Sequence, residues 1–275
     1  MPVFTQKLEK TDFPKLEQYL IENNFSKESI GQYQLFYYKN INCTVILYSS
    51  GKVVFSGKSP EFHFENWNST GDPIETHIGS DEAGKGDFFG PLVVCASLVD
   101  EKTGLYIKNM GITESKGTSS EKIFKMSQEL KKIIQFETIK INPPKYNELI
   151  KKFKNLNSML AWAHEKAVNT LAEKTKSKAD IIIDKFASVN IKSLHGNKII
   201  METHAEKHIA VAVASVIAKA EVLYWFKNTS KEIGIKIPLG ATNVKSTANS
   251  IISKLGREKL DTLVKTHFKT YKELN

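Results

Sequence analysis

Cysteine is scarce in this chain of 275 residues: only Cys43 and Cys95 are present, and they lie far apart in the sequence. A disulfide framework is therefore not expected, and both cysteines are expected to be buried thiols. The absence of disulfides fits a protein of the reducing cytoplasm. The first seven residues carry no apolar leader, and the longest apolar run of the second half, 209–218, is shorter than the roughly 20 residues that a membrane helix needs. We therefore expect neither a secretion signal nor a membrane span.

Acidic residues are outnumbered, since 30 Asp and Glu stand against 39 Lys and Arg, which gives a net charge of +9. Residues 1–70 carry seven lysines and seven acidic residues, so the whole excess lies in residues 71–275. Within that part, residues 122–154 hold nine lysines against three glutamates. Such a stripe suits a polyanion such as a nucleic-acid backbone, although a generic lysine-rich surface is the plainer alternative.

Length and polarity predict two domains. A chain of this length exceeds the usual size of one domain, and a stretch rich in Asn, Ser and Gly begins at Pro60 and ends at Asp72. We read this stretch as a connection between domains. We place a small domain at 1–65, a linker at 66–72 and a larger domain at 73–275.

The small domain is predicted to be a helix followed by an antiparallel meander. Asp12 and Pro14 are typical of a helix start, and a period of two predicts strands at 32–38, 43–48 and 52–56. Thirteen of the chain's 27 aromatic residues lie in residues 1–70. About half of them would fill a small core, and the rest could form a face for nucleic acid.

The larger domain is predicted to be a mixed sheet with helices packed on it, an α/β arrangement. Strands are expected at 74–78, 91–99, 105–110, 136–141, 180–184 and 198–201. Helices are expected after a cap at Ser119 or Ser120, after the prolines at 143 and 144, and at 158–174, 208–226, 240–254 and 257–271.

Two adjacent carboxylates, Asp81 and Glu82, lie at the end of the predicted strand 74–78, just before a glycine-rich turn. Adjacent acids repel each other, and burying them without a partner is costly, so a positive charge is expected beside them. A divalent cation with oxygen ligands, Mg²⁺ or Mn²⁺, fits this chemistry.

The same segment also matches most of a phosphate-binding loop. Gly79, Gly84 and Lys85 match the first, sixth and seventh positions of the pattern G-x-x-x-x-G-K-[ST]. The eighth position is Gly86, so the hydroxyl that would hold Mg²⁺ is missing. The two carboxylates would also face the phosphates, and we therefore exclude a nucleotide hydrolase of this class.

The run Asp81-Glu82-Ala83-Gly84-Lys85-Gly86 resembles the signature of type 2 ribonucleases H, and its continuation Asp87-Phe88-Phe89-Gly90-Pro91 resembles the ribonuclease HIII branch. The resemblance covers most of residues 78–274. It implies a ribonuclease H-like mixed sheet flanked by helices, and a substrate-binding small domain that resembles the TATA-binding-protein fold. The implied activity is hydrolysis of the RNA strand of an RNA–DNA hybrid.

Two further carboxylates take roles from the resemblance. Asp184 ends an apolar strand, a position that a solvated loop residue would fill equally well, and its context resembles the third catalytic carboxylate. Glu206 precedes an apolar helix, where it could merely complement the helix dipole, and it resembles the fourth. The implied site holds two Mg²⁺ or Mn²⁺ ions on Asp81, Glu82, Asp184 and Glu206. It leaves 5′-phosphate and 3′-hydroxyl ends.

Substrate-binding residues are also implied. In the family, the loop that corresponds to Gly84, Lys85 and Gly86 reads the 2′-hydroxyl, and Lys85 stands where the HII branch commonly has arginine. We therefore expect weak cleavage at a single embedded ribonucleotide. Ser115, Lys116 and Lys219 are candidate substrate contacts, the lysines for phosphate, although ordinary surface lysines remain the alternative. Glu114 stands where the family usually has aspartate before the Ser-Lys pair.

Two other functions stay open. A zinc hydrolase could use His204 and His208 with Glu206, but the acid lies one place later than in H-E-x-x-H, so we expect no zinc. A basic nucleic-acid-binding module with a decayed site is the non-enzymatic alternative, and four candidate carboxylates argue against decay. The remaining histidines are expected to be structural, with His164 the foremost exception because it lies in a stretch similar to the HIII branch. A monomer is expected.

Overall fold

The structure, a computed structural model, describes residues 2–68, 74–109 and 118–274. Its contacts divide the chain into two compact units, Met1–Pro73 and Ile74–Asn275.

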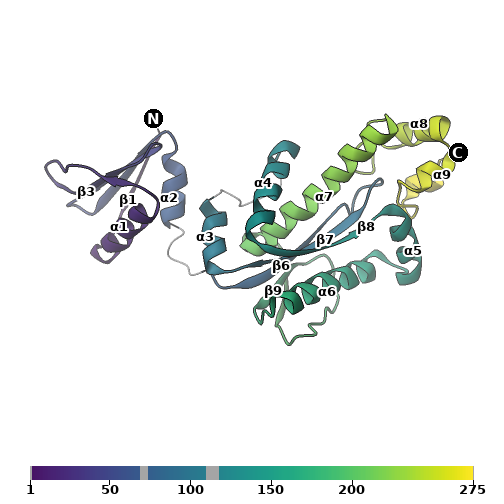
Figure 1. The fold of residues 1–275 in the computed structure, drawn as a ribbon, viewed down its shortest axis with the longest axis horizontal. Helices are drawn as coiled ribbons and strands as arrows, with labels where there is room; N and C mark the ends of the chain where they lie inside the picture. Colours follow the sequence, from purple (N-terminus) through teal and green to yellow (C-terminus); the bar gives the residue numbers. More distant parts are fainter. Residues whose placement is uncertain (1, 69–73, 110–117, 275) are drawn as a thin grey trace. The chain divides into compact units, whose positions relative to one another are not determined.

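The first unit is a five-stranded antiparallel sheet in the order β1-β5-β4-β3-β2 with helices on one face (Figure 1). Its elements are β1 (Val3–Lys7), α1 (Phe13–Glu22), β2 (Ser26–Lys27), β3 (Gln34–Lys39), β4 (Cys43–Tyr48), β5 (Lys52–Gly57) and α2 (Pro60–Asn68). Leu16 and Leu20 of α1 and Trp67 of α2 share one buried cluster with Val45 and Phe55 of the sheet. Strand side chains alternate between faces. Within residues 2–68, α1 and α2 both lie on one face of the sheet, and no helix covers the other.

Three of these elements were not predicted. Residues 60–68 were expected to be irregular, but they form α2, and Trp67 buries its ring against the sheet. The strands β1 and β2 were missed: β1 pairs with Lys52–Ser56 of β5, and β2 pairs with the end of β3. The meander β3-β4-β5 and the helix starting beside Pro14 were predicted correctly. Residues 69–73, part of the expected linker, lie outside the described residues.

The second unit is a mixed sheet in the order β10-β9-β6-β7-β8, in which β6, β7 and β8 are antiparallel and β9 and β10 run parallel to β6. Its strands are β6 (His77–Ala83), β7 (Leu92–Val99), β8 (Gln135–Ile141), β9 (Asp180–Asp184) and β10 (Ile199–Glu202). Its helices are α3 (Glu101–Asn109), α4 (Ser120–Ile133), α5 (Pro143–Phe153), α6 (Leu156–Thr175), α7 (Ile209–Ile233), α8 (Lys245–Leu255), α9 (Arg257–Asp261) and α10 (Lys269–Lys272).

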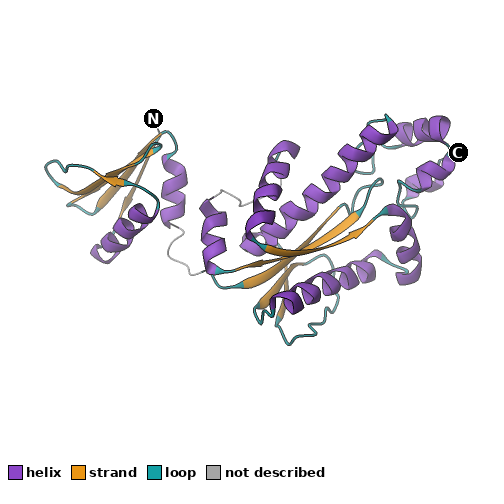
Figure 2. Cartoon of the chain, viewed as in Figure 1, coloured by secondary structure: helices purple, strands orange, loops and turns teal. Residues whose placement is uncertain are grey.

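Helices cover both faces of this sheet, with α6 on one side and α7 on the other (Figure 2). Consecutive residues of β7 show the division: Val93 and Cys95 pack in the cluster beneath α7, whereas Val94 and Ala96 pack in the cluster beneath α6. The α/β fold with a mixed sheet is therefore confirmed. α7 is long and apolar enough to cross a membrane by composition, with a mean hydropathy of 1.7, but 61% of its most apolar window is buried within the unit.

Gly79 lets α7 lie directly on β6. A Cβ atom at this position would lie 2.2 Å from the backbone of Ala210 and Val211, so any larger residue would push the helix off the sheet. On the neighbouring strand, the Ser97 hydroxyl donates a 2.6 Å hydrogen bond to the Ala210 carbonyl. The start of α7 is therefore held within van der Waals contact of the strand that carries the first two carboxylates.

Several predictions for this unit were wrong. Residues 105–110 were expected to form a strand, but Glu101–Asn109 is α3, with Leu105 43% exposed and Ile107 buried. A short apolar run of this kind fits a helix as well as a strand. The expected helix 257–271 is divided into α9 and α10. The cap at Ser119 is confirmed, since its side chain accepts from the Lys122 amide.

Candidate active site

The end of β6 carries Asp81 and Glu82, and the strand points their side chains to opposite layers of the unit. Ser80 and Glu82 face α6, where both contact His164. Asp81 faces α7, where Ser215 is its hydrogen-bond partner. Neighbouring residues of a strand always alternate in this way, so the side chains of the two acids point to opposite faces of the sheet although the residues are adjacent in sequence.

The negative charge of Asp81 is disfavoured by its surroundings. Its pKa is raised from 3.8 to about 6, mainly by burial, then by the negative charge of Glu82, with a smaller effect of Asp184 in the same direction. Hydrogen bonds from Ser215 and from the Glu82 amide, at 2.8 Å, oppose the rise. A cation beside Asp81 would relieve both the burial and the repulsion.

Glu82 is held at both oxygens. Its Oε1 accepts from Lys85 Nζ at 2.7 Å and its Oε2 lies 3.3 Å from His164 Nε2, with 8% of the side chain exposed. Burial opposes ionisation, but the hydrogen bonds and charges of His164 and Lys85 outweigh it and lower the pKa of Glu82 below its usual value. Glu82 therefore ionises more readily than Asp81.

Asp184 ends β9 beside Asp81. β9 runs parallel to β6 with Ile183 opposite Ser80, so the next position on each strand is a carboxylate. The amide of Ala205 donates a 3.1 Å hydrogen bond to Asp184 Oδ1. This bond ties the turn that carries Glu206, the 3-10 helix η3 (Ala205–Lys207), to the end of β9.

The structure thus brings Asp81, Glu82 and Asp184 to the adjacent ends of two paired strands. Glu206 lies on η3, which the Ala205 amide ties to Asp184. Within residues 2–68, 74–109 and 118–274, no three His, Cys, Asp or Glu side chains form a closed metal cluster. Opposed faces and mutual repulsion account for the open arrangement. The donor set, hard carboxylate oxygens beside a carboxylate with a raised pKa, still fits Mg²⁺ or Mn²⁺, which keep several water ligands.

Gly84 and Gly86, in the glycine-rich turn, have different roles, which the sequence did not distinguish. Gly84 has φ +83° and its Cβ would lie 2.2 Å from the Pro91 carbonyl, so the turn itself requires glycine there. Gly86 is exposed and no atom lies within 4 Å of a Cβ built on it. Of these two glycines, therefore, Gly86 is the one with room for a ligand to approach the backbone.

Lys265 supports the segment that follows this turn. Its side chain is fully buried, and its Nζ donates to the carbonyls of Asp87 at 2.8 Å and Phe89 at 3.3 Å. Burial lowers the pKa of Lys265 to about 7, and the charge of Asp87 opposes that change. Sequence reasoning missed this role because the contacts span almost 180 residues; the one available signal was the run Lys265-Thr266-His267-Phe268, similar to the C-terminal part of the HIII branch.

The remaining candidate residues lie as follows. Ser115 and Lys116 fall outside the described residues. Lys219 lies on α7 one turn after Ser215, and both are half-buried positions on a helix whose neighbouring residues are buried. His208 contacts Glu202 Oε1, and His204 Nδ1 lies 3.8 Å from Glu206, so the two histidines of the zinc alternative face different acids.

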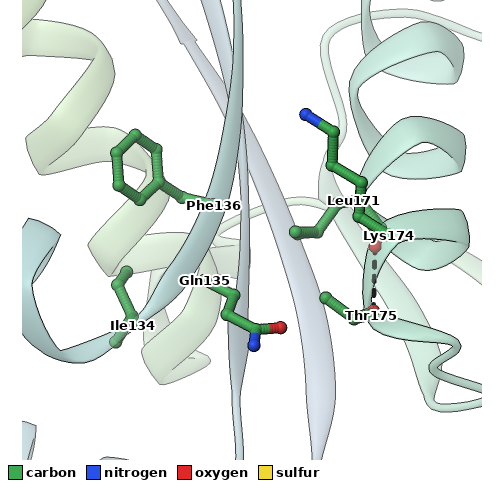
Figure 3. Close-up of a pocket in the computed structure, with 6 residues that line it drawn as sticks. All are labelled: Ile134, Gln135, Phe136, Leu171, Lys174 and Thr175. Carbon is green, nitrogen blue, oxygen red and sulfur yellow. Dashed lines mark hydrogen bonds between the residues drawn. The ribbon is translucent and has the colours of Figure 1, made fainter.

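A cavity of about 340 Å³ lies away from the carboxylates, between the start of β8 and the end of α6 (Figure 3). Its lining residues are Ile134, Gln135, Phe136, Leu171, Lys174 and Thr175. Gln135 pairs with Leu98, which pairs with Ile78, so the cavity lies two strands away from β6 and level with its start, not with Asp81. No acidic side chain lines it, and we do not assign the site there.

Comparisons with known proteins match both units. The family model for ribonuclease HII matches residues 78–271, and a domain of unknown function matches residues 4–73. Ribonuclease HIII of Chlamydia felis is 34% identical over 263 residues, 88% of each chain, and that of Protochlamydia amoebophila is 33% identical over 98% of this chain and 96% of the other. Among solved structures, Bst-RNase HIII in complex with Mn²⁺ superposes with a TM-score of 0.68, 25% identity and coverage of 99% and 97%. Aquifex aeolicus RNase H3 superposes with a TM-score of 0.62, 28% identity and coverage of 97% and 100%.

Proposed function

The chain belongs to the ribonuclease HII family, and within it to the ribonuclease HIII proteins, and we propose that it hydrolyses the RNA strand of RNA–DNA hybrids with two divalent ions. Family membership makes it a metal-dependent endoribonuclease. The observation that supports the site is the paired ends of β6 and β9, where Asp81 and Asp184 occupy successive positions of adjoining parallel strands.

Asp81, Glu82, Asp184 and Glu206 would hold the ions, Mg²⁺ or Mn²⁺. Bound there, the two ions would lower the pKa of an attacking water and stabilise the leaving oxygen. The chain's own part is to hold the four carboxylates: Ser215 orients Asp81, and the Ala205 amide orients Asp184. With water rather than the 2′-hydroxyl as nucleophile, the products carry 5′-phosphate and 3′-hydroxyl ends.

Selection for RNA would fall to the turn after Glu82. The 2′-hydroxyl distinguishes RNA from DNA, and backbone groups can bond to it where no side chain intervenes. The open surroundings of Gly86 support that role, and Gly84 shapes the turn. Lys85 would contribute a point charge rather than a planar fork, and we expect weak cleavage at a single embedded ribonucleotide. Ser115, Lys116 and Lys219 would contact the substrate backbone.

The first unit would bind the hybrid through the open face of its sheet. Tyr37, Ile46, Tyr48 and Val54 alternate with the buried strand residues and are half-buried on that face. Residues 1–70 carry no net charge, so aromatic and apolar contacts with sugars and bases would hold the substrate there rather than Coulomb attraction. We further propose that the protein acts as a monomer in the cytoplasm.

A 5′-labelled RNA–DNA hybrid tests this function. The protein is incubated with the hybrid and Mg²⁺, Mn²⁺ or EDTA, and the ends of the fragments are mapped. We expect internal cuts in the RNA strand with either ion, 5′-phosphate ends, and no cleavage in EDTA. Asp184→Asn should bind hybrid but lose activity; near-full activity of this variant with Mg²⁺ would show that the site is assigned wrongly.

A further inference from the structure

His164 is a buried histidine on α6 that the proposed chemistry does not use. Its side chain has no exposed surface and lies between Ser80 and Glu82, the two residues at the end of β6 that face α6. The ring stacks on Phe186, with centroids 4.9 Å apart and planes 11° from parallel. Packing on one side and hydrogen bonds at both ring nitrogens leave the imidazole a single orientation.

Ser80 fixes the orientation of this ring. The Ser80 hydroxyl lies 2.9 Å from the Cys95 carbonyl and 2.8 Å from His164 Nδ1. With Nδ1 held there and the ring stacked on Phe186, the other nitrogen, Nε2, is aimed at Glu82 Oε2, 3.3 Å away.

We propose that His164 is a positioning residue that orients Glu82 for the ion. This inference rests on the proposed function. His164 holds Oε2 toward α6, which leaves Oε1 as the oxygen that an ion can take. In the structure Oε1 is paired with Lys85, whose side chain is 43% exposed, so the lysine can move away whereas the buried histidine cannot. The ion therefore meets a carboxylate that is already rotated into place.

The alternative is that His164 only fills space and satisfies Ser80. The two roles differ in what happens to ion binding when the ring is removed. Groups that orient a metal ligand through a hydrogen bond typically contribute about 10–100-fold in metal affinity or activity. A space-filling residue would change the stability of the fold and leave ion affinity almost unaltered.

His164→Leu and His164→Gln test the proposal on the full chain. Mn²⁺ affinity is measured without substrate, by the electron paramagnetic resonance signal of free Mn²⁺, and kcat and KM are measured on a hybrid. For His164→Leu we expect Mn²⁺ binding weakened about tenfold or more and a lower kcat with an unchanged KM for hybrid. His164→Gln keeps an N–H donor toward Glu82 and should recover part of both losses.

His77→Gln is the matched control, because His77 is also buried, also hydrogen-bonded at both nitrogens, and lies at the opposite end of β6. It should lower the thermal midpoint while leaving Mn²⁺ affinity within about twofold of the parent, as expected for a group four residues along β6 from Asp81. Equal losses of Mn²⁺ affinity in His77→Gln and His164→Leu would overturn the proposal, as would unaltered Mn²⁺ binding in His164→Leu.

Ser80→Ala keeps the test decisive if His164→Leu does not fold. It removes the hydrogen-bond partner of Nδ1 and leaves both His164 and Glu82 in place, so a smaller loss of Mn²⁺ affinity in the same direction is expected. Parent-like affinity in both Ser80→Ala and His164→Gln, with His164→Leu unfolded, would count against positioning. Failure of the unaltered protein to bind Mn²⁺ or cut hybrid would instead reject the proposed function itself.

Discussion

Replacing Asp81 with asparagine should stabilise the metal-free protein and abolish its activity. Asp81 is ionised at pH 8 although burial, Glu82 and Asp184 all disfavour its charge. Asparagine has nearly the same shape, and its Oδ1 can still accept from the Glu82 amide, a bond of 2.8 Å in the structure. The substitution therefore removes the unfavourable charge and keeps most of the local geometry.

The size and the pH dependence follow from the pKa of Asp81, which rises from an ordinary 3.8 to about 6 on folding. Between these values the folded protein binds more protons than the unfolded chain, so its unfolding free energy falls as pH rises and stays reduced above pH 6. A shift of this size corresponds to about 3 kcal/mol, which we reduce to about 1–2 kcal/mol because the residue is partly exposed to solvent. Asp81→Asn should show that gain at pH 8 and progressively less as the pH approaches 4.

Urea unfolding in EDTA at several pH values measures this difference, with Glu148→Gln as the control. Glu148 is an exposed acid paired with Lys145, and its replacement should change the unfolding free energy by less than about 0.5 kcal/mol. Adding Mn²⁺ at a hundred times its dissociation constant should stabilise the parent by about 2.7 kcal/mol and the variant by much less, reversing their order. An Asp81→Asn protein less stable than the parent at pH 8 in EDTA would refute the electrostatic account.

Two further predictions concern the turn and its support. Gly86→Ala should leave the unfolding free energy within about 1 kcal/mol of the parent but reduce kcat/KM on hybrid at least about tenfold. Gly84→Ala should lower the unfolding free energy by more than about 2 kcal/mol, because the added Cβ meets the Pro91 carbonyl. Equal losses of stability in urea would contradict this division. From pH 7.5 to 9.5 the unfolding free energy of the parent should rise by about 1 kcal/mol per pH unit relative to that of Lys265→Met. The reason is that folding lowers the pKa of Lys265 to about 7, so the unfolded chain binds more protons than the folded protein in this range. Parallel pH profiles of the two proteins would exclude this effect of Lys265.

The sequence predicted those parts of the fold that local patterns determine. The strands β7 and β9 are buried on both faces, and apolar runs rich in Ile and Val are typical of such strands. The strand expected at 74–78 is instead β6, His77–Ala83, because the run Gly79-Ser80-Asp81-Glu82 carries no apolar pattern and is held in the sheet by its pairing with β7 and β9. Residues 105–110 were predicted wrongly because a six-residue run contains too few repeats to separate a period of two from 3.6. Residues 60–68 looked irregular because Ser, Pro and Asn begin and end a segment whose helix is stabilised by tertiary contacts of Trp67.

The sequence singled out the acids of the candidate site but gave little on the groups that hold them. Asp184 ends β9, and Asp81 and Glu82 lie where the pairing of β6 with β9 stops, next to a glycine-rich turn. The contacts of His164 and Lys265 span sequence separations of 82 and about 177 residues, and for them the sequence offered only a resemblance to the HIII branch. The opposite orientation of Asp81 and Glu82 was available, since neighbours on a strand always alternate.

That alternation explains how two adjacent acids can serve one site. Each is oriented from a different layer, Asp81 by Ser215 of α7 and Glu82 by His164 of α6, so neither competes with the other for its partner. Their pKa values then diverge: that of Glu82 is lowered and that of Asp81 is raised. An ion bound between β6 and β9 would gain its coordination to Glu82 without reorienting it, and would also relieve the repulsion at Asp81. Relief of about 1–2 kcal/mol corresponds to roughly 5- to 30-fold in ion affinity, so the instability of the metal-free strand ends itself favours metal binding.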